Sequence, residues 1–267
     1  MIPKTIHYCW FGRKPLPDLA LKCIQSWQQH CPEWKIMQWN EDNFDVNSIP
    51  YTRQAYEAGR YAFVSDYARF VIIHKYGGVY LDTDVELIAS IDDIIEKGPF
   101  MGCENAMADG STHIDVAPGL GFGAQAGHRI VKELMDSYQS DMFDKGGKQD
   151  LTTVVARTTD ILRRHGLKDI DGIQTLTDGL IIYPKEYFAP KDRDTKQLTI
   201  TPRSRSIHHY DGSWLTPEEQ YVIHAANTWT WMPLKMRYVI SRFIATTRHQ
   251  GIGKALSETL RWVKERT

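Results

Sequence analysis

The sequence predicts an α/β fold in which a mostly parallel sheet is flanked by helices. Short apolar segments alternate with amphipathic helical patterns over residues 5–84, and two aspartates end the last of these segments. Such alternation is typical of a parallel sheet whose functional site lies at the carboxyl ends of its strands. A chain of 267 residues with 42% hydrophobic residues can bury a substantial core. We therefore expect a polar site at one edge of a buried sheet.

The elements are assigned from periodicity and from helix stop signals. Strands are expected at residues 5–11, 34–39, 79–84 and 204–210, and helices at 17–30, 61–76, 90–96, 128–141, 149–165, 217–231 and 233–266. Gly77 and Gly78 supply the stop signal after the helix at 61–76. Residues 175–201 are expected to hold short strands and loops bounded by proline.

The strand expected at 79–84 ends in Asp82 and Asp84. Successive side chains of a strand alternate between its faces, so both aspartates are expected on the same side. Two like charges repel each other and are costly to desolvate, and a divalent cation removes both penalties. Oxygen ligands suit Mg²⁺, Mn²⁺ or Ca²⁺. The alternative is a solvated strand end, because Asp-x-Asp alone is a weak signal.

A second polar pair, Asp66 and Arg69, lies on the helix that leads into this strand. Residues three apart share a helix face, so the pair can line the same cleft as the aspartates. The guanidinium fork of Arg69 suits a planar or tetrahedral oxyanion, and the carboxylate of Asp66 can accept hydrogen bonds. The alternative is an intrahelical ion pair, which stabilises a helix by about 0.2–0.5 kcal/mol.

Six segments together resemble one family of nucleotide-sugar glycosyltransferases. They are IPKTIHYCWFG at residues 2–12, SW at 26–27, WN at 39–40, SDYAR at 65–69, GGVYLDTD at 77–84 and IHHYDGSW at 207–214. In this order they resemble the GT32 family, which includes yeast initiating mannosyltransferases and bacterial capsule and lipooligosaccharide enzymes. The resemblance implies a GT-A type fold, with a mostly parallel Rossmann-like sheet, a helical extension at the C-terminus and an Asp-x-Asp motif that binds the donor.

The resemblance also implies roles for the two aspartates and for a histidine. Asp82 reaches the sugar or ribose as well as the metal, and Asp84 is the firmer metal ligand. The metal stabilises the departing diphosphate as a Lewis acid. On the strand expected at 204–210, adjacent His208 and His209 face opposite ways. The resemblance favours His209 as the third ligand, and imidazole with carboxylates favours Mn²⁺, with Mg²⁺ as the alternative. Otherwise both histidines face solvent or the core.

Further donor contacts follow from the resemblance. Arg69 can pair with the diphosphate, and Asp66 can accept from sugar hydroxyls. Trp10 follows the first strand, where the family places an aromatic near the nucleotide base. Gly212, Ser213 and Trp214 offer backbone and hydroxyl donors to the diphosphate, in a loop that closes over the donor in related enzymes. The alternative for Trp10 and Trp214 is packing in the core.

Asp150 is the candidate on the acceptor side. The resemblance implies retention of anomeric configuration, and a double displacement requires a carboxylate on the far face of the sugar. Asp150 lies where related enzymes carry polar residues on the acceptor side, but it is not assigned as a nucleophile. A front-face path, in which a phosphate oxygen takes the acceptor proton, requires no dedicated base. The alternative for Asp150 is an ordinary charge at a helix N-terminus.

The chain is expected to form a catalytic domain over residues 1–231 and a basic amphipathic extension over 232–267. The extension holds eight Lys or Arg against two Glu, although the whole chain has a net charge of −1. A basic amphipathic helix either lies on an anionic membrane surface or packs on the body through its apolar face. The four cysteines show no pairing pattern, and no signal peptide or spanning segment is evident, so we expect a cytoplasmic location with peripheral contact to the inner face of the cytoplasmic membrane.

The expected activity is metal-dependent, retaining transfer of galactose from UDP-galactose to a saccharide or lipid-linked acceptor in surface polysaccharide or lipooligosaccharide synthesis. One alternative donor is GDP-mannose. Another alternative is a binding protein for sugar nucleotides that has lost turnover. A phosphohydrolase is disfavoured, because the motif follows two expected strands and continues with Val-Glu. No nucleic-acid partner is expected.

Overall fold

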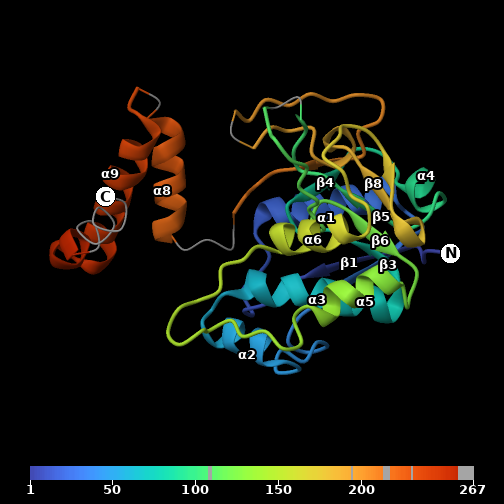
Figure 1. Cartoon of the computed structure of the whole chain (residues 1–267), viewed down its shortest axis with the longest axis horizontal. Coiled ribbons are helices and arrows are strands. Elements are labelled where there is room, and N and C mark those ends of the chain that lie inside the picture. The colour runs from blue at the N-terminus through green and yellow to red at the C-terminus, as the bar shows by residue number, and fades with distance from the viewer. Residues whose placement is uncertain (108–109, 194, 213–216, 230, 258–267) are drawn as a thin grey trace. The chain divides into compact units, whose positions relative to one another are not determined.

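The computed structural model describes residues 1–107, 110–193, 195–212, 217–229 and 231–257 (Figure 1). The chain divides into two compact units, Met1–Tyr210 and Asp211–Thr267. The helix expected at 217–231 pairs with the helix after it, and both belong to the second unit. A catalytic domain over residues 1–231 with a basic extension over 232–267 stays a prediction.

A seven-stranded sheet in the order β2-β1-β3-β6-β5-β8-β7 forms the centre of the first unit. Its strands are β1 (Thr5–Cys9), β2 (Lys35–Trp39), β3 (Gly78–Tyr80), β5 (Phe100–Gly102), β6 (Phe122–Ala124), β7 (Gln174–Thr175) and β8 (Ile181–Tyr183). β1, β2, β3, β5 and β8 run in one direction, while β6 and β7 pair antiparallel with their neighbours. The sheet is therefore mixed, and the predicted α/β class is confirmed.

Helices cover both faces of this sheet (Figure 1). They are α1 (Asp18–His30), α2 (Pro50–Glu57), α3 (Tyr61–Tyr76), α4 (Asp92–Ile95), α5 (Arg129–Asp136), α6 (Val154–Arg164) and α7 (Lys185–Phe188), with the 3₁₀ turn η2 at Thr177–Gly179. One hydrophobic cluster includes Phe70 of α3 and Ile130 of α5. The other includes Trp27 of α1. Along β1 the side chains alternate between the clusters, with Tyr8 in the second and Cys9 in the first.

His7 joins β1 to the end of α3. Its Nε2 atom lies 3.0 Å from the carbonyl oxygen of Gly77, and Nε1 of Trp39 donates to its Nδ1 at 3.0 Å. An indole N–H can only donate and a carbonyl can only accept, so the imidazole is neutral with its proton on Nε2. Burial lowers the pKa of His7 to about 4. Gly78 has a φ of 103°, and a Cβ there would lie 2.7 Å from the carbonyl oxygen of Thr5. The glycine is therefore required for β3 to lie against β1.

The strand expected at 79–84 is interrupted. β3 ends at Tyr80, and β4 (Val85–Leu87) belongs to a separate two-stranded sheet with β9 (Ser206–His208). The chain turns between them, with the amide of Val85 donating to the carbonyl oxygen of Asp82 at 3.1 Å. The prediction of one continuous strand is wrong, because the amide of Asp82 bonds to Gly119 and the chain then leaves the large sheet.

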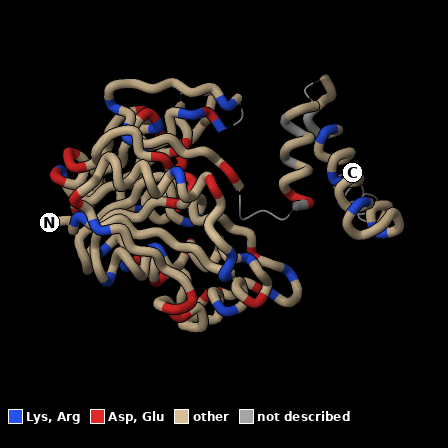
Figure 2. The backbone as a smooth tube through the Cα atoms, turned by 180° about the vertical axis from the view of Figure 1, so that it is seen from behind, with Lys and Arg blue, Asp and Glu red and all other residues tan. Residues whose placement is uncertain are grey.

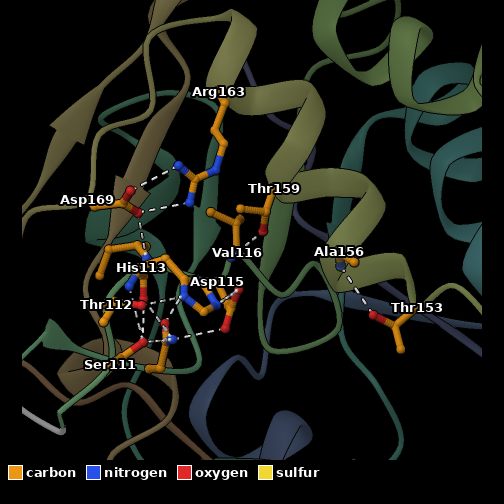
Figure 3. Close-up of polar contacts among 12 residues, drawn as sticks. Ser111, Thr112, His113, Asp115, Val116, Thr153, Ala156, Thr159, Arg163 and Asp169 are labelled. Carbon is orange, nitrogen blue, oxygen red and sulfur yellow. Dashed lines mark hydrogen bonds and ion pairs between the residues drawn. The ribbon is translucent and has the colours of Figure 1, made fainter.

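The helix expected at 149–165 begins later, at Val154. Thr153 is its N-cap, and its side-chain oxygen accepts from the amide of Ala156 at 3.2 Å (Figure 3). Asp150 therefore lies in the preceding loop and not at the helix N-terminus, so its expected placement on the helix is wrong.

The second unit contains α8 (Pro217–Thr228) and α9 (Leu234–Gln250). Glu218 of α8 accepts hydrogen bonds from Thr246 at 2.7 Å and from Gln250 at 2.8 Å. The guanidinium of Arg248 lies 4.8 Å from the centre of the Tyr221 ring. These contacts hold the two helices together as a hairpin. Within the part of the chain that the structure describes, no helix combines the length and the hydropathy that a bilayer crossing requires.

Candidate active site

Asp82 and Asp84 lie in the turn that follows β3, at the carboxyl edge of the large sheet. The amide of Asp82 donates to the carbonyl oxygen of Gly119 at 2.9 Å, and its side chain is 31% exposed. The side chain of Asp84 is 17% exposed. The structure therefore brings both aspartates to the expected edge of the sheet, through a turn and not through the alternation of a strand.

Arg69 links the helix pair to this turn. Its Nη2 atom lies 2.9 Å from Oδ1 of Asp66 and 3.3 Å from Oδ1 of Asp82, and its side chain is only 4% exposed. Its Nε donates to the carbonyl oxygen of Ser65 at 3.1 Å, and the guanidinium lies 4.7 Å from the centre of the Tyr80 ring. The intrahelical ion pair is therefore present, and the same guanidinium also contacts the Asp-x-Asp turn.

Burial and the neighbouring charges together set the pKa values of Asp66 and Arg69. It raises the pKa of Asp66 to about 6, against the positive charge of Arg69 and with the negative charge of Asp82 adding to the rise. Burial alone would lower the pKa of Arg69, but the carboxylates of Asp82 and Asp66 raise it. One buried guanidinium thus holds two carboxylates, and it stays charged.

His208 is the last residue of β9, and His209 follows it. The two imidazoles contact different acidic residues. Nε2 of His208 lies 3.2 Å from Oδ1 of Asp84, whereas Nε2 of His209 lies 2.7 Å from Oε2 of Glu86. The register of β9 on β4, in which Val85 pairs with His208, produces this arrangement. The imidazole beside the Asp84 side chain is therefore that of His208. The backbone amide of the expected partner, His209, donates to the carbonyl oxygen of Asp84 at 3.0 Å.

His208 sits in a negatively charged environment. Burial lowers its pKa, but the charges of Asp84, Asp82 and Glu104 outweigh burial and raise it. Its ring centre lies 4.1 Å from that of Tyr210. Within the described residues, Nδ1 of His208 and the hydroxyl of Tyr210 are buried without a hydrogen-bond partner. Unpaired buried polar atoms are typical of a site that a ligand or water completes.

The residues at this edge fit a divalent cation by their chemistry. Carboxylate oxygens from Asp82 and Asp84 and an imidazole nitrogen from His208 form the kind of mixed set that Mn²⁺ accepts. The described residues contain no group of three such side chains that already converge on one point. The side chains of Asp82, Asp84 and His208 would therefore have to move closer together to bind an ion.

Glu104 is a site residue that the sequence did not single out. It follows β5, which runs in the same direction as β3, so it reaches the same edge of the sheet as Asp82. Burial raises its pKa, and Arg193 and His208 oppose the rise. A single glutamate after a short strand carries no motif, so only the sheet topology reveals it.

Trp10 follows β1 at this edge and is half-buried. Its Nε1 donates to the carbonyl oxygen of Lys14 at 2.7 Å, and its amide donates to Trp39 at 2.9 Å. The ring packs partly against the cluster around α1. The packing interpretation therefore holds in part, and stacking on a base stays a prediction.

The described contacts of Asp150 are with residues close to it in the sequence. Nζ of Lys145 lies 2.8 Å from its Oδ2 atom, and the amide of Thr152 donates to Oδ1 at 3.0 Å. Burial would raise its pKa, but these hydrogen bonds lower it to about 2. None of its described hydrogen bonds or ion pairs reaches Asp82 or Asp84.

Gly212 lies in the second unit with a φ of 64°, and its carbonyl oxygen accepts from Gln220 at 3.3 Å. Ser213 and Trp214 lie outside the described residues. Their expected contacts with a donor stay predictions.

Residues 17–101 match the family model described as a glycosyltransferase sugar-binding region containing a DXD motif. The chain is 28% identical over 98 residues to inositol phosphoceramide mannosyltransferase 3 of Schizosaccharomyces pombe, a match that covers 35% of this chain and 27% of the relative. It is 26% identical over 116 residues to inositol phosphoceramide mannosyltransferase 1 of the same yeast, covering 38% and 33%. The match to an uncharacterized glycosyltransferase of Acanthamoeba polyphaga mimivirus is 30% identical over 106 residues and covers 38% and 42%.

The chain thus spans less than half of the length of each of these relatives. Among solved structures, the PaToxG glycosyltransferase shares 17% identity at a TM-score of 0.47, over 61% of this chain and 69% of that one. The family match contains Asp66, Arg69, Asp82 and Asp84, the residues that meet at the sheet edge. Residues 17–101 are therefore similar to the sugar-binding region of glycosyltransferases that contain a DXD motif.

Proposed function

We propose that this protein transfers a hexose from a nucleoside diphosphate sugar to a saccharide acceptor, with a divalent metal held at the Asp-x-Asp turn. The contact of the buried Arg69 with Asp82 carries this proposal most directly. It fixes one aspartate of the motif at the carboxyl edge of the sheet, where α/β proteins bind nucleotides.

Asp82 and Asp84 would hold the metal, with His208 as the nearest imidazole. When bound, the metal neutralises the departing diphosphate as a Lewis acid. Arg69 orients Asp82 and balances part of the negative charge of the site before any ion enters. Mn²⁺ suits the mixed oxygen and nitrogen ligands, and Mg²⁺ is the alternative.

The proposed donor sugar and its nucleotide base rest on the GT32 resemblance and on the names of the two yeast relatives. The GT32 resemblance favours UDP-galactose and retention of configuration. The two yeast relatives are named as mannosyltransferases, which supports GDP-mannose as the second candidate donor. Their names also contain a lipid, inositol phosphoceramide, which supports a lipid-linked acceptor for this chain. Synthesis of a surface polysaccharide or lipooligosaccharide is the setting that we propose.

A lipid-linked acceptor agrees with the surface of the second unit. Arg237, Arg242 and Arg248 lie on α9. Figure 2 colours the Lys and Arg positions of the chain blue. On the same helix Met236 is 50% exposed and Tyr238 is 43% exposed. Basic and apolar side chains together favour an anionic lipid surface. We propose that the protein is cytoplasmic and contacts the inner face of the membrane through this helix.

The test is nucleotide release from a panel of UDP- and GDP-sugars in the presence of Mn²⁺. Slow hydrolysis of one donor by the wild type, lost in Asp82→Ala, is the expected result, and the active donor names the sugar. Asp136→Asn on α5, whose carboxylate pairs only with Lys132 among the described contacts, is the matched control and should keep wild-type turnover. Equal turnover in wild type and Asp82→Ala would contradict the proposed site.

A further inference from the structure

Gly119 lies directly against the side chain of Asp82. Its carbonyl oxygen accepts the amide hydrogen of Asp82 at 2.9 Å. A Cβ atom at position 119 would lie 1.8 Å from Oδ2 and 2.7 Å from Cγ of Asp82, and 3.2 Å from Nη1 of Arg69. These separations leave no room for a methyl group while the carboxylate keeps its place.

Space, and not backbone conformation, requires a glycine at this position. Gly119 is not among the glycines with positive φ, so its backbone is of a kind that other residues adopt. If the carboxylate of Asp82 were absent, the nearest remaining atom to a Cβ at 119 would be Nη1 of Arg69 at 3.2 Å, so most of the clash would be removed. The absence of a side chain at 119 and the orientation of Asp82 are coupled.

The chain before Gly119 is anchored to α6. The amide of Val116 donates to Oγ1 of Thr159 on that helix at 2.9 Å. The amide of Ile114 donates to Oδ1 of Asp169 at 2.8 Å, and Arg163 of α6 holds both oxygens of Asp169 at 2.9 Å (Figure 3). This segment cannot shift without breaking contacts to a helix.

The residues two positions before and after Gly119 are hydrogen-bonded to the last residue of β5. The amide of Ala117 donates to the carbonyl oxygen of Gly102 at 2.9 Å, and the amide of Gly102 donates to Gly121 at 3.1 Å. Leu120 is 1% exposed and belongs to the core cluster around α1. A side chain introduced at 119 would therefore displace Asp82 and not the backbone.

We propose that Gly119 is a positioning residue that fixes the carboxylate of Asp82 in the orientation used for metal and donor binding. In this orientation Oδ1 contacts Arg69, while Oδ2 occupies the space that a Cβ atom at position 119 would need. The inference rests on the proposed function of Asp82, and it adds a residue that lies outside the matched region 17–101.

The test is a double-mutant cycle of Gly119→Ala and Asp82→Ala, read as Mn²⁺-dependent nucleotide release from the donor that the wild type hydrolyses. We expect Gly119→Ala to lower turnover by about tenfold to a hundredfold, because a misplacement of about 1 Å costs that much at a reacting centre. The apparent affinity for Mn²⁺ should fall as well. Because turnover is already lost in Asp82→Ala, the cycle in that background is read as Tm, where the same change should cost little more, since the displaced group is no longer there.

Thermal unfolding keeps the test informative if Gly119→Ala folds poorly. Removal of the Asp82 carboxylate makes room for the methyl group at position 119. The double variant should therefore have a higher Tm than Gly119→Ala alone. Gly121→Ala is the control for crowding elsewhere, because its Cβ would lie 2.9 Å from Cδ1 of Phe188. It should lower Tm and leave the Mn²⁺ dependence of turnover unchanged.

The outcomes separate the inference from the proposed function. Equal losses of Tm from Gly119→Ala in the wild-type and Asp82→Ala backgrounds, or a wild-type response of turnover to Mn²⁺ in Gly119→Ala, would overturn the positioning role. Wild-type turnover in Asp82→Ala would instead overturn the proposed function, and the positioning role with it.

Discussion

Nη2 of Arg69 lies 3.3 Å from Oδ1 of Asp82, although one residue belongs to α3 and the other to the turn after β3. The same atom lies 2.9 Å from Asp66. A single buried cation therefore connects the helix pair with the Asp-x-Asp motif. This connection makes the stability of the first unit and the geometry of its site depend on the same side chain.

Arg69→Ala should be strongly destabilising. The substitution leaves the carboxylate of Asp66, whose side chain is 12% exposed, without its ion-pair partner. Removal of one member of a buried ion pair costs about 3–5 kcal/mol, so the free energy of unfolding should fall by about that amount. Urea denaturation measures it. Arg69→Lys keeps the charge without the fork and should lose less stability than Arg69→Ala. A loss below about 1 kcal/mol for Arg69→Ala would show that the pair is solvated.

The two histidines should differ in their effect on metal dependence. His208→Gln removes the imidazole beside Asp84, so the Mn²⁺ concentration for half-maximal nucleotide release should rise by about tenfold or more. His209→Gln removes a partner of Glu86 and should change it less. A titration of turnover with Mn²⁺ separates the two variants. The reverse order of effects would favour His209, as the GT32 resemblance implies.

His7 should make the folded protein sensitive to mild acid. Its pKa is lowered to about 4 by burial, while an unfolded histidine has a pKa of about 6.5. The unfolded state therefore binds the proton more tightly, so this contribution to stability is complete above about pH 6.5 and is lost as the pH falls towards about 4. The loss amounts to about 3 kcal/mol.

The measurement for this prediction is the free energy of unfolding between about pH 7 and pH 4. His7→Gln, which cannot take up a proton, should flatten the pH dependence in this range. The control His249→Gln replaces an exposed histidine and should retain the wild-type slope. An unchanged slope in His7→Gln would mean that another group titrates.

The fold follows from the sequence where local signals agree with the tertiary structure. The helix expected at 61–76 is observed as Tyr61–Tyr76, because the apolar spacing and the glycine stop signal indicate the same ends. The strand at 79–84 fails because its end depends on a long-range bond, from the amide of Asp82 to Gly119. The sequence around Leu81 contains no local signal that predicts this hydrogen bond.

Part of the site was also predictable from the sequence, and part of it depends on long-range contacts. Asp82, Asp84, Asp66 and Arg69 are found together because a helix that runs into a strand end places its polar face at the sheet edge. The choice between His208 and His209 depends on the register of β9 on β4, which alternation alone leaves open. Glu104 depends on the order of the strands in the sheet, and Gly119 on a contact of atoms distant in sequence.

The most direct test of the metal site is donor hydrolysis by wild type and Asp84→Ala, each with Mn²⁺ and with EDTA. We predict that EDTA abolishes the wild-type reaction and that added Mn²⁺ restores it. Asp84→Ala should lose about a hundredfold or more in Mn²⁺ and respond little to EDTA, because the remaining turnover no longer uses a bound ion. Wild-type turnover in Asp84→Ala that EDTA still abolishes would place the metal elsewhere and contradict the assignment of the Asp-x-Asp turn.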